Sequence, residues 1–204
     1  MRIGIDLDNT IICYDDVFLG VARHLGVSLP ASCQTKLEIK NFLLAEGRAI
    51  DWMRLQGQAY GLGMPLAKLY DGVDEFIRTC RQKQTPLVIV SHKSRYGHFD
   101  AERTDLCQAA LEWLGAQGFF HDDQLGMKVR DVYFEETRDR KIDMIAGLDL
   151  SVFIDDLPEV FQSPLFPDST RAILFSPGIS SPDTGPYQVC SSWRQIGDKV
   201  FQDR

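Results

Sequence analysis

Two pairs of aspartates stand directly after short apolar runs of the sequence, at positions where strands would end. Asp6 and Asp8 follow the first run, and Asp155 and Asp156 follow a later one. Carboxylates in such pairs can act as nucleophiles, move protons or coordinate a hard metal ion. A spacing of two places the Asp6 and Asp8 side chains on one face of a strand if the extended geometry continues.

A hydroxyl and an ammonium group complete this pattern. Ser91 ends the apolar run at residues 87–90, and Lys141 lies early in a segment with helical periodicity, residues 138–146. In an open parallel sheet, ligands bind beyond the carboxyl ends of the strands. We therefore expect the four aspartates, Ser91 and Lys141 to meet at one edge of a sheet, in a site that combines acids, a hydroxyl and a cation.

The order of these motifs resembles the haloacid dehalogenase superfamily, whose members share a Rossmann-like sheet and are mostly magnesium-dependent phosphatases or phosphotransferases. The family's first motif, DxDx[TV], matches residues 6–10, and its second, a Ser or Thr at a strand end, matches Ser91. Its third motif is a lysine, matched by Lys141, and its fourth is a paired acid, matched by Asp155 and Asp156. Each motif alone is common, but four in this order at strand ends form a strong joint signal.

The resemblance implies a role for each acid. Asp6 is the nucleophile that forms an aspartyl-phosphate, and Asp8 first protonates the leaving alkoxide and then deprotonates the attacking water. The cofactor is Mg²⁺, held by Asp6, the backbone carbonyl of Asp8 and Asp155. Asp156 supports this site or reaches the metal through water. Ser91 donates a hydrogen bond to the phosphoryl group.

Lys141, in this reading, offsets the charge of the phosphate and of Asp6. A plainer interpretation places Lys141 on a solvated helix face, where the arginines at 138 and 140 could take its role. Ser91 could instead cap the following turn, and the acids at 6 and 8 could be solvated side chains at a strand-to-turn junction.

The acids at 155 and 156 also have a second interpretation, as the start of a helix before Pro158. Aspartate is a good N-cap, and proline is favoured in the first helical turn. Capping and metal binding are compatible with each other.

A basic segment at residues 92–98 follows Ser91 and contains four potential cations and no acid. Its members His92, Lys93 and Arg95 are candidates for binding a distal anionic group of the substrate. The alternative is a solvated loop, because runs of charge usually mark exposure.

The elements that must position these residues alternate along the chain. Strands are predicted at residues 1–7, 87–90, 132–134, 152–154 and 172–175, and helices at 73–82, 104–117, 138–146 and 191–201. This alternation predicts an α/β fold with a Rossmann-like, doubly wound parallel sheet. Residues 14–70 read instead as consecutive helices. We therefore predict a catalytic core at 1–13 and 71–204, with a small helical cap insertion at 14–70 that resembles the family's C1 cap class.

Composition limits the possible partners. The chain has 204 residues and a formal net charge of −7, which disfavours a general nucleic-acid or anionic-membrane binder. Its five cysteines contain no CxxC pair, and no stretch approaches the roughly 20 apolar residues of a membrane span. We expect a cytoplasmic protein without a disulfide framework; the sequence carries no signal for an oligomeric state.

The function predicted from these observations is a magnesium-dependent phosphatase that hydrolyses a small phosphorylated metabolite. Nothing in the sequence favours a nucleotide over a sugar. A phosphomutase or phosphotransferase of the same superfamily is an alternative, as is a noncatalytic or regulatory binding protein that keeps the fold. Carbon–halogen hydrolysis fits less well, because a departing halide gives the general acid Asp8 nothing to protonate.

Overall fold

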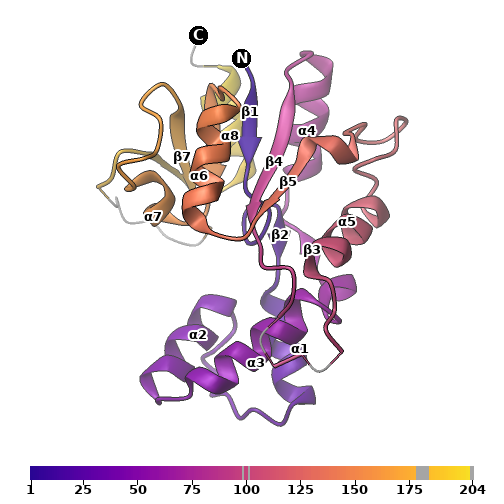
Figure 1. The fold of residues 1–204 in the computed structure, drawn as a ribbon, viewed down its shortest axis with the longest axis vertical. Coiled ribbons are helices and arrows are strands. Elements are labelled where there is room, and N and C mark those ends of the chain that lie inside the picture. The colour runs from indigo at the N-terminus through magenta and orange to yellow at the C-terminus, as the bar shows by residue number, and fades with distance from the viewer. Residues whose placement is uncertain (98, 101, 178–183, 203–204) are drawn as a thin grey trace. The chain divides into compact units, whose positions relative to one another are not determined.

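The computed structural model describes residues 1–97, 99–100, 102–177 and 184–202. The chain divides into two compact units. The first comprises Met1–Ile12, Leu69–Lys93 and Gly118–Arg204, and the second comprises Cys13–Lys68 and Ser94–Gln117. Each unit is built around its own set of elements (Figure 1).

The first unit contains a six-stranded sheet in which every neighbouring pair of strands is parallel. Its order is β5-β4-β1-β6-β7-β8. The strands are β1 (Ile3–Ile5), β4 (Leu87–His92), β5 (Val132–Glu135), β6 (Val152–Asp155), β7 (Arg171–Phe175) and β8 (Gln188–Cys190). The predicted α/β class with a doubly wound parallel sheet is therefore confirmed.

Strand β1 lies in the middle of this sheet and is buried along its whole length. Ile5 pairs with Ile89 of β4 on one side and with Ile154 of β6 on the other. Gly4 is required by close packing, because a Cβ atom there would lie 2.4 Å from a methyl carbon of Leu150. The chain leaves β1 toward β4 and returns on its other side at β6, so the order of strands reverses beside β1.

Helices cover both faces of the sheet. The helices α6 (Arg138–Gly147) and α7 (Pro158–Phe161) supply Ile142, Ile145 and Phe161 to a buried cluster with β4, β6 and β7. The helices α4 (Val73–Gln82) and α8 (Trp193–Phe201) contact each other, and the ring of Trp193 packs against Phe76 of α4. The β-strands therefore have apolar residues on both sides, as expected for a buried parallel sheet.

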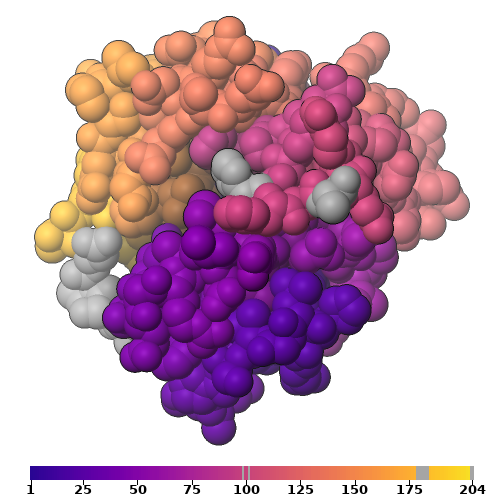
Figure 2. All heavy atoms as spheres, turned by 60° about the horizontal axis from the view of Figure 1, so that its bottom comes forward, coloured from indigo at the N-terminus to yellow at the C-terminus, as the bar shows by residue number. Residues whose placement is uncertain are grey.

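The second unit is helical. It contains α1 (Asp15–His24), α2 (Lys36–Ala45), α3 (Ala49–Tyr60), the short 3-10 helix η1 (Met64–Leu66) and α5 (Leu106–Ala116). Phe18 of α1 stacks on Trp52 of α3, with ring centroids 5.1 Å apart. Trp113 of α5 donates a hydrogen bond from Nε1 to the carbonyl oxygen of Ala67, at 3.1 Å. The residues of α2 and α3 form much of the purple surface in Figure 2.

Several helices begin at side chains that accept hydrogen bonds from the first turn. Thr35 and Glu38 form a capping box at α2, and Asp105 accepts bonds from the amides of Cys107 and Gln108 at α5. Thr137 accepts a bond from the amide of Arg140 at the start of α6. These polar caps give α2, α5 and α6 defined starting points.

The two units can be compared with the expected core at 1–13 and 71–204 and the expected cap at 14–70. The helical segment at 13–68 ends within two residues of the expected limits at 14 and 70, but residues 94–117 group with it rather than with the sheet. Burial of Leu106, Trp113 and Leu114 against this unit accounts for the difference. An amphipathic pattern shows that a helix packs, but not which unit receives its apolar face.

Some short elements were not predicted. They include β8, the 3-10 helix η2 (Val129–Asp131), and the strands β2 (Ile12–Cys13) and β3 (Lys68–Leu69), whereas α7 begins at Pro158, where a helix start was one interpretation of the preceding acids. The strands β2 and β3 pair as a separate two-stranded sheet. All of these elements have two to four residues, too few to show a hydrophobic period. Among the described residues, no helix combines the length and apolar character that crossing a bilayer requires.

The burial of Cys80 in α4 leads to a testable prediction about the reactivity of its thiol. This thiol is 2% exposed, and burial raises its pKa to about 12. At about pH 8 the reactive thiolate is therefore nearly absent, and iodoacetamide should modify Cys80 only after the chain is unfolded. Mass spectrometry of alkylated peptides measures this. Modification of Cys80 in the native protein as fast as in guanidinium-unfolded protein would contradict the packing.

Candidate active site

The candidate residues come together beyond the carboxyl ends of three adjacent strands. Asp6 follows β1, Ser91 lies near the end of β4, and Asp155 ends β6, followed by Asp156. Because β1 lies between β4 and β6, these positions surround the point where the strand order reverses. Such a switch point is where open α/β sheets bind ligands. Lys141 reaches the same place from the first turn of α6.

The segment after β1 turns sharply and holds Asp6 in place. The Asp6 amide donates to the carbonyl oxygen of Ile154 at 2.8 Å, which continues the sheet by one residue. The carbonyl oxygen of Leu7 then accepts bonds from the amides of residues 11 and 12, and Asn9 adopts a positive φ of 64°. Trp193 of α8 donates to the carbonyl oxygen of Thr10, at 3.1 Å. A buried indole therefore anchors this turn.

Lys141 forms the central contact of the site. Its Nζ lies 2.5 Å from Oδ1 of Asp6 and 2.7 Å from Oδ2 of Asp155. All three side chains are buried, with exposures of 1% for Lys141, 7% for Asp6 and 0% for Asp155. Charge-assisted hydrogen bonds are strong in such surroundings. The structure therefore does not place Lys141 on a solvated helix face.

The electrostatics of this cluster favour additional positive charge. Burial raises the pKa of the Asp6 carboxyl to about 7, although Lys141 acts to lower it, and nearby Asp155 raises it further. Burial lowers the pKa of the Lys141 ammonium, but the carboxylates of Asp155 and Asp6 outweigh this and leave it raised. The pKa of Asp6 is thus raised chiefly by burial, whereas the pKa of Lys141 is raised by the two carboxylates that it contacts.

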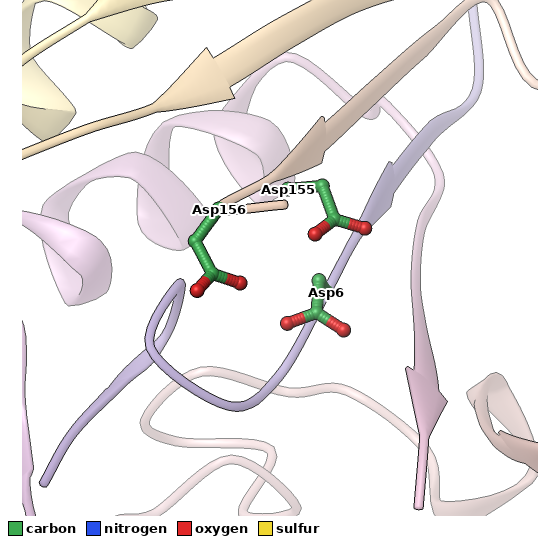
Figure 3. A group of neighbouring side chains, drawn as sticks. All are labelled: Asp6, Asp155 and Asp156. Carbon is green, nitrogen blue, oxygen red and sulfur yellow. The ribbon is translucent and has the colours of Figure 1, made fainter. Parts of the chain in front are cut away.

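Three carboxylates form a group that could hold a cation. Asp6, Asp155 and Asp156 each offer one oxygen atom, and these atoms lie within 4.8 Å of one another. Figure 3 shows the side chains turned toward a shared space beside the ends of β1 and β6. Carboxylate oxygens are the ligands that Mg²⁺ prefers. The donor set and the excess negative charge therefore both fit a hard divalent cation.

Helix capping does not exclude Asp155 and Asp156 as candidate metal ligands. The amide of Leu157 donates to Oδ1 of Asp155 at 2.9 Å, which stabilises the turn before α7. No side chain caps α7 itself, which begins at Pro158. Asp155 can thus fix the local turn with one oxygen while its other oxygen accepts from Lys141.

Ser91 has an unsatisfied hydroxyl. Its exposure is 0%, and its Oγ finds no hydrogen-bond partner within the described part of the chain. Leaving a buried polar atom unpaired costs about 1–3 kcal/mol, so native proteins normally give such an atom a protein, water or ligand partner. The hydroxyl is therefore suited to an incoming acceptor such as a phosphoryl oxygen, and a turn-capping role is not observed for it.

The structure gives Lys93 a partner that sequence reasoning missed. Its Nζ lies 2.6 Å from Oδ2 of Asp8, and the two side chains are 2% and 16% exposed. The neighbouring His92 is exposed, with Nε2 3.1 Å from the carbonyl oxygen of Glu136. The sequence does contain a sign of this placement, because Lys93 stands two residues after Ser91 and the alternation of side chains along a strand puts both on one face.

The rest of the basic segment belongs to the helical unit. Arg95 is largely exposed and pairs with Asp105, whose Oδ2 lies 2.9 Å from its Nε. Its guanidinium also lies 5.4 Å from the ring centroid of Tyr96. His98 lies outside the described residues. The basic segment is therefore divided between the two units and does not form a single solvated loop.

Comparison with solved structures identifies the fold. No family model matches the chain, and no curated protein matches it closely. A HAD-family hydrolase from Deinococcus radiodurans R1, with bound phosphate and sodium, has a TM-score of 0.59 and 16% identity. The match covers 98% of this chain and 95% of that one.

Two further structures show the same likeness. A predicted phosphatase from Clostridium acetobutylicum has a TM-score of 0.62 and 15% identity, with 98% of both chains covered. A predicted phosphoglycolate phosphatase from Haemophilus somnus 129PT has a TM-score of 0.57 and 12% identity, with 98% of this chain and 97% of that chain covered. At these identities the likeness concerns the fold. This chain therefore has the fold of the haloacid dehalogenase superfamily hydrolases, as its four motifs predict.

Proposed function

We propose that the protein is a magnesium-dependent phosphatase that hydrolyses a small phosphorylated metabolite through an aspartyl-phosphate intermediate. The observation that carries this proposal is the buried cluster in which Lys141 contacts both Asp6 and Asp155. The unpartnered hydroxyl of Ser91 supports it, because a phosphoryl oxygen would satisfy that buried donor.

In the proposed first step, a carboxylate oxygen of Asp6 attacks phosphorus and forms a new P–O bond. The bond between phosphorus and the ester oxygen breaks, and that oxygen takes the proton of Asp8 as it leaves as an alcohol. Asp8 is then a carboxylate. Ser91 and Lys141 donate hydrogen bonds to the negative charge that gathers on the transferring group.

In the second step, Asp8 removes a proton from water while the water oxygen attacks phosphorus. The bond between phosphorus and Asp6 breaks, inorganic phosphate is released, and Asp8 is protonated again for the next cycle. One carboxyl thus serves as acid and then as base.

Asp6, Asp155 and Asp156 would hold the cation, together with the backbone carbonyl of Asp8. A bound Mg²⁺ supplies charge that offsets the repulsion between the phosphate ester and the attacking carboxylate. Burial of Asp6 and Asp155 keeps water from competing for these charges.

The helical unit is proposed to act as a cap that selects the substrate. It consists of residues 13–68 and 94–117, inserted on either side of the strand that carries Ser91. A cap that closes over the metal would exclude water and select the leaving group, which favours small phosphorylated metabolites over phosphoproteins. We place the reaction in the cytoplasm, where the five free cysteines would stay reduced.

The nucleophile test is the substitution Asp6→Asn. We expect it to lower kcat for phosphate release by about 10⁴-fold or more, because the amide cannot form the intermediate. Phosphate release from 4-nitrophenyl phosphate with Mg²⁺ measures this, and EDTA should abolish it in the wild type. Asp168→Asn, an exposed acid of the same unit, is the matched control. Activity that survives Asp6→Asn removes the proposed mechanism.

The substitution Lys141→Met tests the central ion pair. It leaves two buried carboxylates without their cation, so the free energy of unfolding should fall by about 3–5 kcal/mol. Mg²⁺ should restore part of this loss, because a ligand of the folded state stabilises it. Urea titrations with and without Mg²⁺ measure both effects.

The control for this experiment is Lys128→Met, which removes the exposed ion pair with Asp122 and should leave the unfolding midpoint nearly unchanged. An unchanged midpoint for Lys141→Met would show that the buried cluster does not depend on its lysine.

A role for Arg95 in binding a distal anionic group predicts a selective defect. Arg95→Ala should raise KM about tenfold for substrates with a second anionic group and leave the others unchanged, since one lost contact of about 1.4 kcal/mol is a factor of ten. A panel of phosphorylated sugars, nucleotides and small acids measures this, with exposed Arg23→Ala as control. The same preference in wild type and Arg95→Ala would remove Arg95 from the substrate site.

A further inference from the structure

The ion pair between Lys93 and Asp8 is not explained by the family resemblance, which assigns no role to Lys93. The contact is short, at 2.6 Å between Nζ and Oδ2, and Lys93 is almost fully buried. Burying an ammonium group is costly unless a carboxylate compensates it. A buried lysine in this position therefore has a role in the structure or the site, unlike an exposed lysine that only interacts with solvent.

Both partners are held by well-defined backbone. The amide of Lys93 donates to the carbonyl oxygen of Glu135 at 2.9 Å, so the pairing between β4 and β5 continues past His92. Asp8 forms a bridge with Ile12 in the turn after β1. The Lys93 side chain thus reaches Asp8 from a neighbouring strand of the sheet, and the contact joins two anchored segments.

The two buried lysines serve different acids. Lys141 contacts Asp6 and Asp155, whereas Lys93 contacts Asp8. Asp156 adds a fourth aspartate to this group, so two buried lysines lie among four aspartates. Lys93 is thus the lysine that contacts the proposed general acid.

We infer that Lys93 is a positioning residue, whose ammonium group fixes the orientation of the Asp8 carboxyl for proton transfer to the leaving group. This inference rests on the proposed function and replaces the expectation that Lys93 binds a distal anion of the substrate. Proton transfer needs a donor within hydrogen-bond reach of the leaving oxygen, so a carboxyl that rotates freely is a poorer acid.

The inference predicts that the defect of Lys93→Met depends on the leaving group. Phenyl phosphate has a more basic leaving group than 4-nitrophenyl phosphate and needs the proton more. We expect Lys93→Met and Asp8→Asn to lower the single-turnover rate of alcohol release at least about tenfold more for phenyl phosphate, since proton transfer contributes about 10²–10⁴-fold. The control is Lys128→Met, which removes an exposed pair.

A double-variant cycle decides whether Lys93 acts through Asp8. Adding Lys93→Met to Asp8→Asn should change the rate by no more than about twofold, because the group to be positioned is already gone. A further loss in the double variant, or an equal loss of Lys93→Met on both substrates, overturns the inference and leaves the phosphatase proposal standing.

Two more outcomes are decisive. If Lys93→Met does not fold, the double variant still carries neither charge of the pair, and its rate is compared with that of Asp8→Asn alone by the same criterion. If the wild type with Mg²⁺ releases no phosphate from either ester or from the metabolite panel, the proposed function fails, and the inference fails with it.

Discussion

The contact of one buried lysine with two buried aspartates is the constraint on which the rest of this structure depends. Lys141 comes from the helix that precedes β6, whereas Asp6 directly follows β1 and Asp155 ends β6. None of the three charges could remain buried alone, because an isolated ion in the interior is far less stable than in water. The cluster therefore requires that α6, β1 and β6 keep their relative positions.

The parallel sheet supplies those positions. Because β1 lies between β4 and β6, its carboxyl end has a neighbour on each side, and each neighbour contributes polar side chains. The β4 side provides Ser91 and Lys93, which are a hydroxyl and a cation, and the β6 side provides the paired acids. Ser91 and Lys93 thus lie on one side of Asp6, the proposed nucleophile, and the paired acids lie on the other, an arrangement suited to receiving a phosphoryl group near a cation.

The sequence was sufficient to predict the sheet class, the longer helices and the convergence of the four motifs. Apolar runs ending in acids mark strand ends, and the geometry of parallel sheets brings such ends together. Short elements such as α7 and β8 carried no periodic signal. The grouping of α5 with the helical unit could not be predicted either, because it depends on tertiary contacts such as the bond from Trp113 to Ala67.

The ion pair of Lys93 with Asp8 was missed for a different reason. A dense run of cations suggested exposure, but strand periodicity continues to Lys93 and directs it with Ser91 into the site. For Lys93, the continuation of the strand therefore predicts burial correctly, whereas the local run of charges predicts exposure.

The most direct test of the account is to identify the residue that becomes phosphorylated during turnover. Protein mixed with 4-nitrophenyl phosphate and Mg²⁺ is quenched in acid, digested and analysed by mass spectrometry. The account predicts a hydroxylamine-labile phosphoryl group on Asp6. Turnover with the phosphoryl group on another residue, or with no phosphorylated protein at any quench time, would contradict it.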